Sequence, residues 1–286
     1  MVEKSDPNVK ILVACHKPVA HILENDIFMP IHVGKSLHPE VDLGFTTDST
    51  GDNISDKNDS FCELTALYWA WKNLKNVDYI GLCHYRRYLN FTGEDPLKVN
   101  DFFEKFSSSS GTTELKKELN YLLDRYPVLI PKKDYCDESI YESYARDHHE
   151  KDLLNTFEII RDNYDNSFVE SFIKTANGNR ITLCNMFVMP WETFCEYCEF
   201  LFHVLFELEK KTDLSNYDTY QKRIYGFIGE RLLNVFLNRE NAGFKTKEIP
   251  VLLTESPTKH NLFHYSPFCK RNRKYIFSKH KKLPVD

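Results

Sequence analysis

Five short runs of apolar residues constrain the fold of this chain more than any other feature. They are continuous rather than alternating, and they cover residues 10–15, 78–83, 127–131, 181–189 and, more weakly, 248–253. Continuous apolar strands are typical of a sheet that is covered on both faces. Stretches with helical periodicity separate the runs, so the sequence predicts an α/β fold with a mainly parallel central sheet flanked by helices.

Helical patterns fill the segments between these strands. Residues Ser60 to Glu63 have the form of a capping box, and apolar residues then repeat at helical spacing as far as Leu74. Further helices are expected over residues 138–149, 153–164, 192–209 and 217–238. Ligands of such folds bind beyond the carboxyl ends of the parallel strands. We therefore look for functional residues directly after the predicted strands.

The composition is that of a globular protein. Of its residues, 42% are hydrophobic and 28% are charged. A chain of 286 residues is long enough to bury a sizeable core. No apolar run approaches the length of a membrane span, and the first residues contain no apolar segment that could act as a signal peptide. A cytoplasmic location is therefore expected.

The C-terminal segment differs in charge from the rest of the chain. Residues 257–286 contain eight Lys and Arg against one Asp, a net charge of +7, which leaves −12 on residues 1–256. We therefore expect a folded domain over residues 1–256 and a basic aromatic tail over residues 257–286. Such tails are typical of proteins that bind an anionic surface, either a membrane or a nucleic acid. The interleaved aromatic residues suit a peripheral position at the inner face of the plasma membrane.

The segment His84-Tyr85-Arg86-Arg87 directly follows the second predicted strand. Two adjacent guanidinium groups offer planar sets of N–H donors that match phosphate oxygens. The alternative is a solvated basic turn with aromatic packing. The flanking aromatic residues favour the phosphate site, because they would partly exclude water from it.

Short polar side chains are dense in the loop over residues 47–55. Asp48, Asp52, Asn53 and Ser55 could bind sugar hydroxyls, a ribose or a divalent metal ion. The alternative is an ordinary polar turn, which Gly51 and Asn53 fit.

Three further places contain candidate residues. The adjacent His148 and His149 are a poor metal chelate, but one of them could act as an acid or base. Asn185 interrupts an apolar strand, so its side chain requires a hydrogen-bond partner or a ligand. The last predicted helix carries four charged residues, for which ion pairs within the protein are the default explanation. They are Asp218, Arg223, Glu230 and Arg231.

Motifs of several large enzyme classes are missing from the sequence. It contains no Gly-x-Gly-x-x-Gly and no Gly-x-x-x-x-Gly-Lys-Ser/Thr, which disfavours dinucleotide oxidoreductases and P-loop NTPases. It also lacks a Gly-x-Ser-x-Gly elbow, which disfavours α/β hydrolases.

Several blocks together resemble one bacterial family. They are VACHKP, TGDNISDKNDSFCELTALYWAWKN, DYIGLCHYRRYLNF, NMFVMPWETFCEYCEFLFHVLFELE and YDTYQKRIYGFIGERLLNVFL. The family is catalogued as domain of unknown function 4422, and its members are similar to glycosyltransferases of capsule and O-antigen polysaccharide biosynthesis. The matched blocks span almost all of the chain before the tail, and the His-Tyr-Arg-Arg-Tyr block is the most specific of them.

This resemblance implies a GT-A-like nucleotide-diphospho-sugar transferase fold. It also implies a UDP-sugar donor, with galactose or galactofuranose favoured, and a lipid-linked glycan acceptor. Enzymes of this fold usually hold Mn or Mg with an Asp-x-Asp at the end of the strand before the active site. Here that strand ends in His84-Tyr85-Arg86. A divalent metal is left open as a cofactor, no residue is assigned as its ligand, and Arg86 with Arg87 could neutralise the leaving diphosphate instead.

The resemblance and the patterns together assign roles to individual residues. The residues expected to bind the donor or a sugar are His16, Asn53, Ser55, His84, Tyr85, Arg86, Arg87, Asn185 and Asp218. The candidates for acid–base catalysis are Asp48, Asp52, His148 and Glu230. The alternative function is that of a non-catalytic nucleic-acid-binding protein that uses the tail and the Arg86–Arg87 pair. The net charge of −12 on residues 1–256 disfavours this alternative, so no nucleic-acid partner is expected.

Overall fold

The computed structural model describes residues 6–92, 99–240, 242–254 and 281–285. These residues form a nine-stranded sheet, in which seven strands follow the order β10-β6-β9-β4-β1-β2-β3. The seven are β1 (Val9–Cys15), β2 (Phe28–His32), β3 (Thr46–Thr47), β4 (Tyr79–His84), β6 (Val128–Pro131), β9 (Phe187–Pro190) and β10 (Thr246–Ile249). Outside this order, β5 (Arg87–Leu89) pairs with β4 and with β11 (Val251–Leu253). A separate two-stranded sheet joins β7 (Asp134–Tyr135) to β8 (Arg180–Ile181).

The sheet is mixed, with a parallel centre. Strand β1 pairs in parallel with both β2 and β4, β2 pairs in parallel with β3, and β6 does so with β10. Strand β9 lies antiparallel between β4 and β6. The predicted α/β fold with a mainly parallel central sheet is therefore confirmed. Because β9 is antiparallel, its first residues, rather than its last, lie near the carboxyl ends of β1 and β4.

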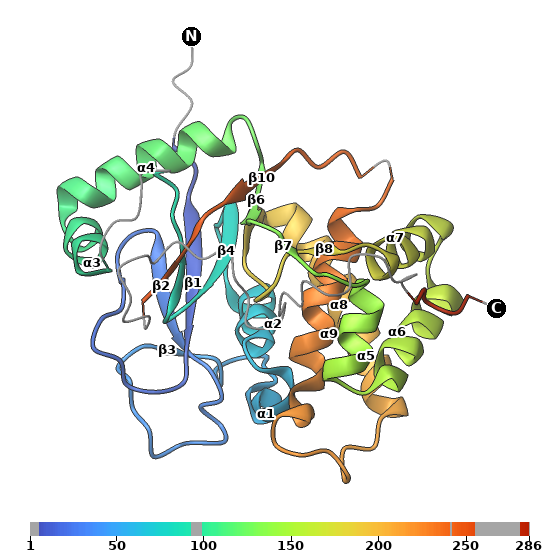
Figure 1. Cartoon of the computed structure of the whole chain (residues 1–286). Coiled ribbons are helices and arrows are strands. Elements are labelled where there is room, and N and C mark those ends of the chain that lie inside the picture. Colours follow the sequence, from blue (N-terminus) through green and yellow to red (C-terminus); the bar gives the residue numbers. More distant parts are fainter. Residues whose placement is uncertain (1–5, 93–98, 241, 255–280, 286) are drawn as a thin grey trace.

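Helices cover both faces of the sheet (Figure 1). One face packs against α3 (Val99–Ser107) and α4 (Ser109–Leu123). The other packs against α2 (Leu64–Asn73), α8 (Trp191–Lys211) and α9 (Ile224–Leu237). Three further helices complete this second side: α5 (Ile140–Asp147), α6 (Glu150–Asn163) and α7 (Asn166–Asn177). None of the helices in the described residues is long and apolar enough to cross a membrane.

Two local predictions are wrong. The capping box at Ser60–Glu63 does not form, because Ser60 lies inside α1 (Asn58–Phe61) and the chain breaks at Cys62, which has a φ of 52°. The strand expected over residues 181–189 is broken, since Cys184 and Asn185 both have positive φ and only the part after them joins the main sheet. The side chains of Glu63 and Asn185, which lie at these two breaks, hydrogen-bond to each other across the fold.

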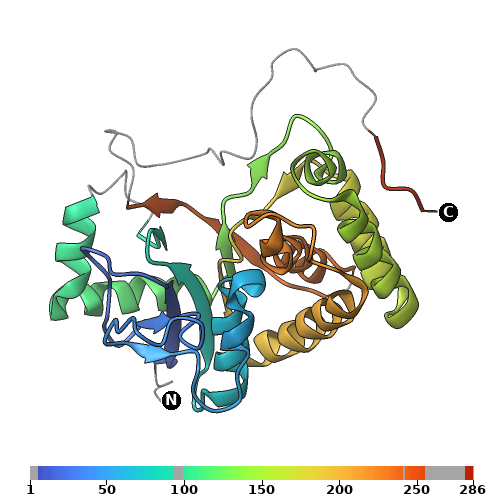
Figure 2. The same cartoon turned by 90° about the horizontal axis from the view of Figure 1, so that it is seen from below.

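The described end of the C-terminal tail packs on the domain. Leu283 is 3% exposed and belongs to the apolar core beside α5–α7. Its N–H donates to Asn177 Oδ1 at 2.8 Å, and Ser139 Oγ donates to the carbonyl oxygen of Lys281 at 2.9 Å. Both views place residues 281–285 on the side of the molecule opposite α3 and α4 (Figure 2). The remaining expected tail, residues 257–280, lies outside the described residues, so the division at residue 256 stays a prediction.

Replacing Leu283 by alanine should lower the free energy of unfolding by about 2 kcal/mol, the low end of the range for a buried leucine. The Leu283 side chain is buried, so its loss should leave a cavity. We expect the low end of the range because Leu283 anchors only the short segment 281–285. Urea denaturation measures the effect. Val285→Ala is the matched control, because Val285 is 54% exposed and should change stability by less than about 0.5 kcal/mol. Equal stability of the two variants would show that this segment does not dock in solution.

Candidate active site

The carboxyl ends of the central strands bring distant parts of the chain together. Cys15 at the end of β1 lies beside His32 of β2, and Ala14 lies beside His84 of β4. Strand β9 begins at the same edge, where Phe187 pairs with Leu82. The residues after β1, those after β4 and the turn before β9 therefore meet at one place.

Cationic side chains gather around the ring of Tyr85, which is 6% exposed. The His16 ring packs edge-on against it at 5.4 Å between centroids, and Lys17 Nζ and the Arg86 guanidinium carbon each lie 5.4 Å from its centroid. Burial lowers the pKa of His16, and Lys17, Arg86 and Arg223 lower it further by repulsion. We call His16, Lys17, Arg86 and Arg223 the basic cluster. Concentrated positive charge of this kind attracts an anionic ligand.

A second set of side chains lies around the turn that precedes β9. Asn185 Nδ2 donates to Glu63 Oε1 at 2.8 Å and to the carbonyl oxygen of Gly226 at 3.1 Å. The N–H of Cys184 donates to Glu230 Oε1 at 2.7 Å. His84 Nε2 donates to the carbonyl oxygen of Cys184 at 2.7 Å. We call Glu63, His84, Asn185 and Glu230 the carboxylate cluster.

Burial perturbs the titration of this cluster. It lowers the pKa of His84; the Glu63 carboxylate opposes the shift, while Arg87 and Arg86 reinforce it. Burial also raises the pKa of Glu230, and Arg231 and the N–H of Cys184 partly oppose this rise. Perturbed groups of opposite kind gathered at one sheet edge are typical of a functional site.

The backbone of the Cys184–Asn185 turn is strained. Two successive residues other than glycine have φ values of 69° and 51°. Asn185 is fully buried, and its Oδ1 has no hydrogen-bond partner among the described residues. Glycine at position 229 permits this packing, because a Cβ there would lie 2.9 Å from Leu64 and 3.2 Å from Asn185 Oδ1. The fold thus holds α9 tightly against a turn that is costly to form.

Asp48 is fully buried under the polar loop and is saturated by protein donors. Its Oδ2 accepts from the N–H of Gly34 at 2.8 Å and from Thr65 Oγ1 at 2.6 Å. Its Oδ1 accepts from the N–H of Lys35 at 3.3 Å and from the hydroxyl of Ser55. Four donors within the described residues occupy the lone-pair positions of one carboxylate. This placement makes Asp48 the anchor of the loop rather than a group that can reach a substrate.

The other predicted residues of this loop lie away from the carboxylate cluster. Asp52 is exposed; it accepts from the Tyr68 hydroxyl at 3.2 Å, and its N–H donates to Asn73 Oδ1 at 3.2 Å. Asn73 is the last residue of α2, about 15 Å along the helix from its start beside Glu63. Asn53 Oδ1 accepts from the N–H of Ser55 at 3.1 Å, which closes a local turn. The loop therefore uses its polar groups mainly on itself and on α2.

His148 and Asp218 lie at the junction of α5 and α9. The His148 ring stacks on Phe227 at 4.1 Å, and its Nδ1 lies 3.2 Å from Gln221 Oε1. Asp218 Oδ1 accepts from the N–H of Gln221 at 2.7 Å. Arg231 links this junction to the carboxylate cluster, because it lies near His148 and its Nη1 donates to Glu230 Oε2 at 2.8 Å.

Acidification should destabilise the native state through His148. Burial, together with repulsion by Arg231, lowers the pKa of His148 to about 4, against an ordinary value of 6.5. The unfolded chain therefore binds a proton that the native chain excludes, and stability falls as pH drops from about 6.5 to about 4. In His148→Gln, the decrease in melting temperature between pH 7 and pH 5 should be smaller than in the parent. The exposed-site control His38→Gln should keep the parent's decrease; an unchanged decrease in His148→Gln would contradict the assignment.

The described residues do not form the metal site that the fold class commonly contains. No three His, Cys, Asp or Glu side chains among them are grouped closely enough to hold a metal ion. No step of the proposed reaction is therefore assigned to a metal.

Sequence patterns missed one member of these clusters and assigned two others to different roles. Lys17 is the second residue after β1, so the search for functional residues after predicted strands could have found it as it found His16. Glu63 was expected mainly as a helix cap, and Arg223 as a partner in an ion pair. Arg223 instead lies near His16, and its Nε donates to Cys62 Sγ at 3.3 Å.

The sheet has a parallel centre and helices on both faces, with cationic groups and carboxylates at the carboxyl edge of its central strands, and this arrangement is consistent with a GT-A-like fold. The chain belongs to the family described as domain of unknown function (DUF4422), which matches residues 10–241. Its structure is similar to the apo structure of the bifunctional glycosyltransferase WbbM, with a TM-score of 0.78 and 31% sequence identity. The match covers 87% of this chain and 46% of WbbM, so the chain spans about half of that protein's length. No curated protein matches the chain. These findings place the chain in this family and show that its structure is similar to part of a glycosyltransferase.

Proposed function

We propose that the chain is a glycosyltransferase that moves a sugar from a UDP-sugar to a glycan acceptor. The observation that carries the proposal is the likeness to a glycosyltransferase over 87% of the chain, at 31% identity. The basic cluster and the carboxylate cluster supply the two kinds of group that such a reaction needs, and they lie at one edge of the sheet. The comparisons lend no support to the alternative of a nucleic-acid-binding protein.

The basic cluster is the proposed site of the donor diphosphate. Lys17 and Arg86 lie against the Tyr85 ring, and His16 packs edge-on against the same ring. Fixed positive groups stabilise the charge that develops on the leaving diphosphate more in the transition state than in the ground state. The proposal that the transferred sugar is galactose or galactofuranose rests on the sequence blocks that the chain shares with the family.

Glu63 is the proposed general base for a single displacement. Its Oε1 is held by Asn185, which leaves Oε2 to accept the proton of the acceptor hydroxyl. The acceptor oxygen forms the new bond to the anomeric carbon, and the bond from that carbon to the diphosphate breaks as UDP leaves with the bonding electrons. Both oxygens of Glu230 are already hydrogen-bonded, so we assign Glu230 to positioning the turn that carries Asn185.

A lipid-linked acceptor of capsule or O-antigen synthesis, at the inner face of the membrane, completes the proposal. It is supported by the family resemblance and by the net charge of +7 on residues 257–286. Each basic residue near an anionic leaflet contributes about 1 kcal/mol to binding. Residues 257–280 lie outside the described residues, so this part rests on sequence alone.

Incubation with a panel of UDP-sugars tests the proposed activity. The panel contains UDP-galactose, UDP-galactofuranose, UDP-glucose and UDP-N-acetylglucosamine, and released UDP is measured with and without a galactose-terminated acceptor. We expect release above background for a galactose form of the donor. Absence of release with every donor, together with a gel shift of DNA or RNA, would overturn the proposal in favour of nucleic-acid binding.

A further inference from the structure

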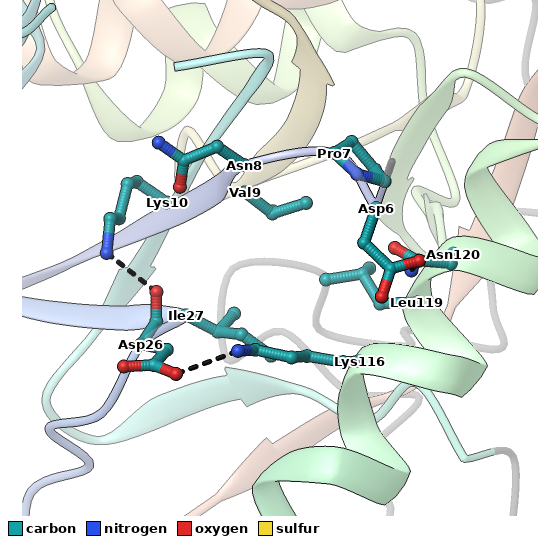
Figure 3. A pocket seen from close by; sticks show the side chains of 10 residues that line it. All are labelled: Asp6, Pro7, Asn8, Val9, Lys10, Asp26, Ile27, Lys116, Leu119 and Asn120. Atoms are coloured by element: carbon teal, nitrogen blue, oxygen red, sulfur yellow. Dashed lines mark hydrogen bonds and ion pairs between the residues drawn. The ribbon is translucent and has the colours of Figure 1, made fainter. Parts of the chain in front are cut away.

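A pocket of about 330 Å³ lies at the amino edge of the sheet, away from the candidate active site. It is formed by the start of β1, the residues before β2 and one face of α4 (Figure 3). Strand β1 has seven residues, so the pocket lies about 20 Å from His16 and the basic cluster. The lining residues are Asp6, Pro7, Asn8, Val9, Lys10, Asp26, Ile27, Lys116, Leu119 and Asn120. This volume is within the range of pockets that bind small ligands.

Hydrogen bonds hold the polar side chains of this pocket in place. Lys116 Nζ lies 2.7 Å from Asp26 Oδ2, and Lys10 Nζ donates to the carbonyl oxygen of Asp26 at 2.7 Å (Figure 3). Asn120 Nδ2 donates to Asp6 Oδ1 at 3.0 Å. The ion pair with Lys116 also lowers the pKa of Asp26. Side chains that are already ordered lose less entropy when a ligand binds.

The charge balance of the pocket favours a neutral ligand rich in hydroxyl groups. Its lining contains two lysines, two aspartates and two asparagines, so formal charges cancel and both donors and acceptors are present. Val9, Ile27 and Leu119 also line the pocket, and since none is more than 6% exposed they form its apolar floor beneath the polar side chains. A sugar ring presents hydroxyls at its edge and C–H groups on its faces, which matches this combination. A phosphate or nucleotide would meet two carboxylates here, whereas the basic cluster contains no carboxylate.

We propose that this pocket binds a neutral hexose unit of the glycan that the enzyme extends, as a second carbohydrate site remote from the reaction. The choice of ligand rests on the proposed function. A second contact on the same glycan would raise its effective concentration at the active site without taking part in the chemistry.

Saturation-transfer NMR on the full chain tests the proposal, with galactotetraose and UDP as separate probes. The variants are Lys116→Met and Asn120→Leu, which keep side-chain size but remove polar contacts. The matched control is Lys117→Met, since Lys117 is the next residue of α4, is exposed and does not line the pocket. We expect the galactotetraose signal to fall at least five-fold in both variants and to persist in the control, while the UDP signal is unchanged throughout.

Other results would overturn the proposal. Galactotetraose signals that are absent from the parent, or equal in parent and variants, would show that the pocket binds no glycan. A UDP signal that disappears with Lys116→Met would show that the pocket is a nucleotide site. Failure of the proposed function is seen separately, as absence of UDP release from any UDP-sugar.

Discussion

Arg86→Ala should lower kcat by about 10²–10³-fold, the effect of removing one preorganised donor from a developing negative charge. Arg86 lies two residues after the end of β4 and packs against Tyr85 within the basic cluster. Loss of its guanidinium group removes charge where the diphosphate leaves, and this corresponds to about 3 kcal/mol of transition-state stabilisation. The measurement is steady-state release of UDP from the preferred donor.

Arg125→Ala is the matched control for this substitution. Arg125 is exposed at the end of α4, where its guanidinium carbon lies 3.7 Å from the centroid of the Tyr121 ring. It should retain the parent's kcat, and both variants should keep a cooperative thermal transition. Arg86→Lys should recover part of the lost rate, since it restores charge without the planar fork. Parent-like turnover in folded Arg86→Ala would refute the proposed role of Arg86.

Glu63→Gln should lower kcat by about 10²–10⁴-fold, the usual contribution of a general base. The amide oxygen of glutamine can still accept from Asn185 Nδ2, so the turn and its hydrogen bond should persist while proton transfer is lost. The pH profile of kcat should also lose its limb on the acid side.

Glu114→Gln serves as the control for Glu63, because Glu114 lies on α4 in an exposed ion pair with Lys105. It should leave both kcat and the pH profile unchanged. If Glu63→Gln retains the parent's acid limb, the base is another group, and Glu230→Gln becomes the variant to examine.

The buried strands were predictable because burial on both faces leaves a clear pattern. Strands β1, β4 and β6 lie within one residue of the expected runs. Strand β2 was missed, since the run Phe28-Met29-Pro30-Ile31-His32 contains a proline and two less typical strand residues. Helix α4 was missed because its serine-rich start looks like a loop, although Ser108 caps the helix by accepting from the N–H of Gly111.

The candidate site was only partly predictable. His84, Tyr85 and Arg86 could be found because they directly follow a strand that the pattern reveals. The pairing of Glu63 with Asn185 joins residues 122 positions apart, and no local pattern reports such a contact. Asp48 shows the opposite error: a loop dense in oxygen atoms has the composition of a ligand site, but here those atoms satisfy one another.

A crystal structure of the chain with UDP would test the position of the donor site most directly. We expect the diphosphate within hydrogen-bonding distance of the Arg86 guanidinium group and beside His16, at the carboxyl edge of β1 and β4. UDP bound instead in the pocket lined by Lys116 and Asn120, or on any surface remote from β4, would contradict the donor site proposed for this chain.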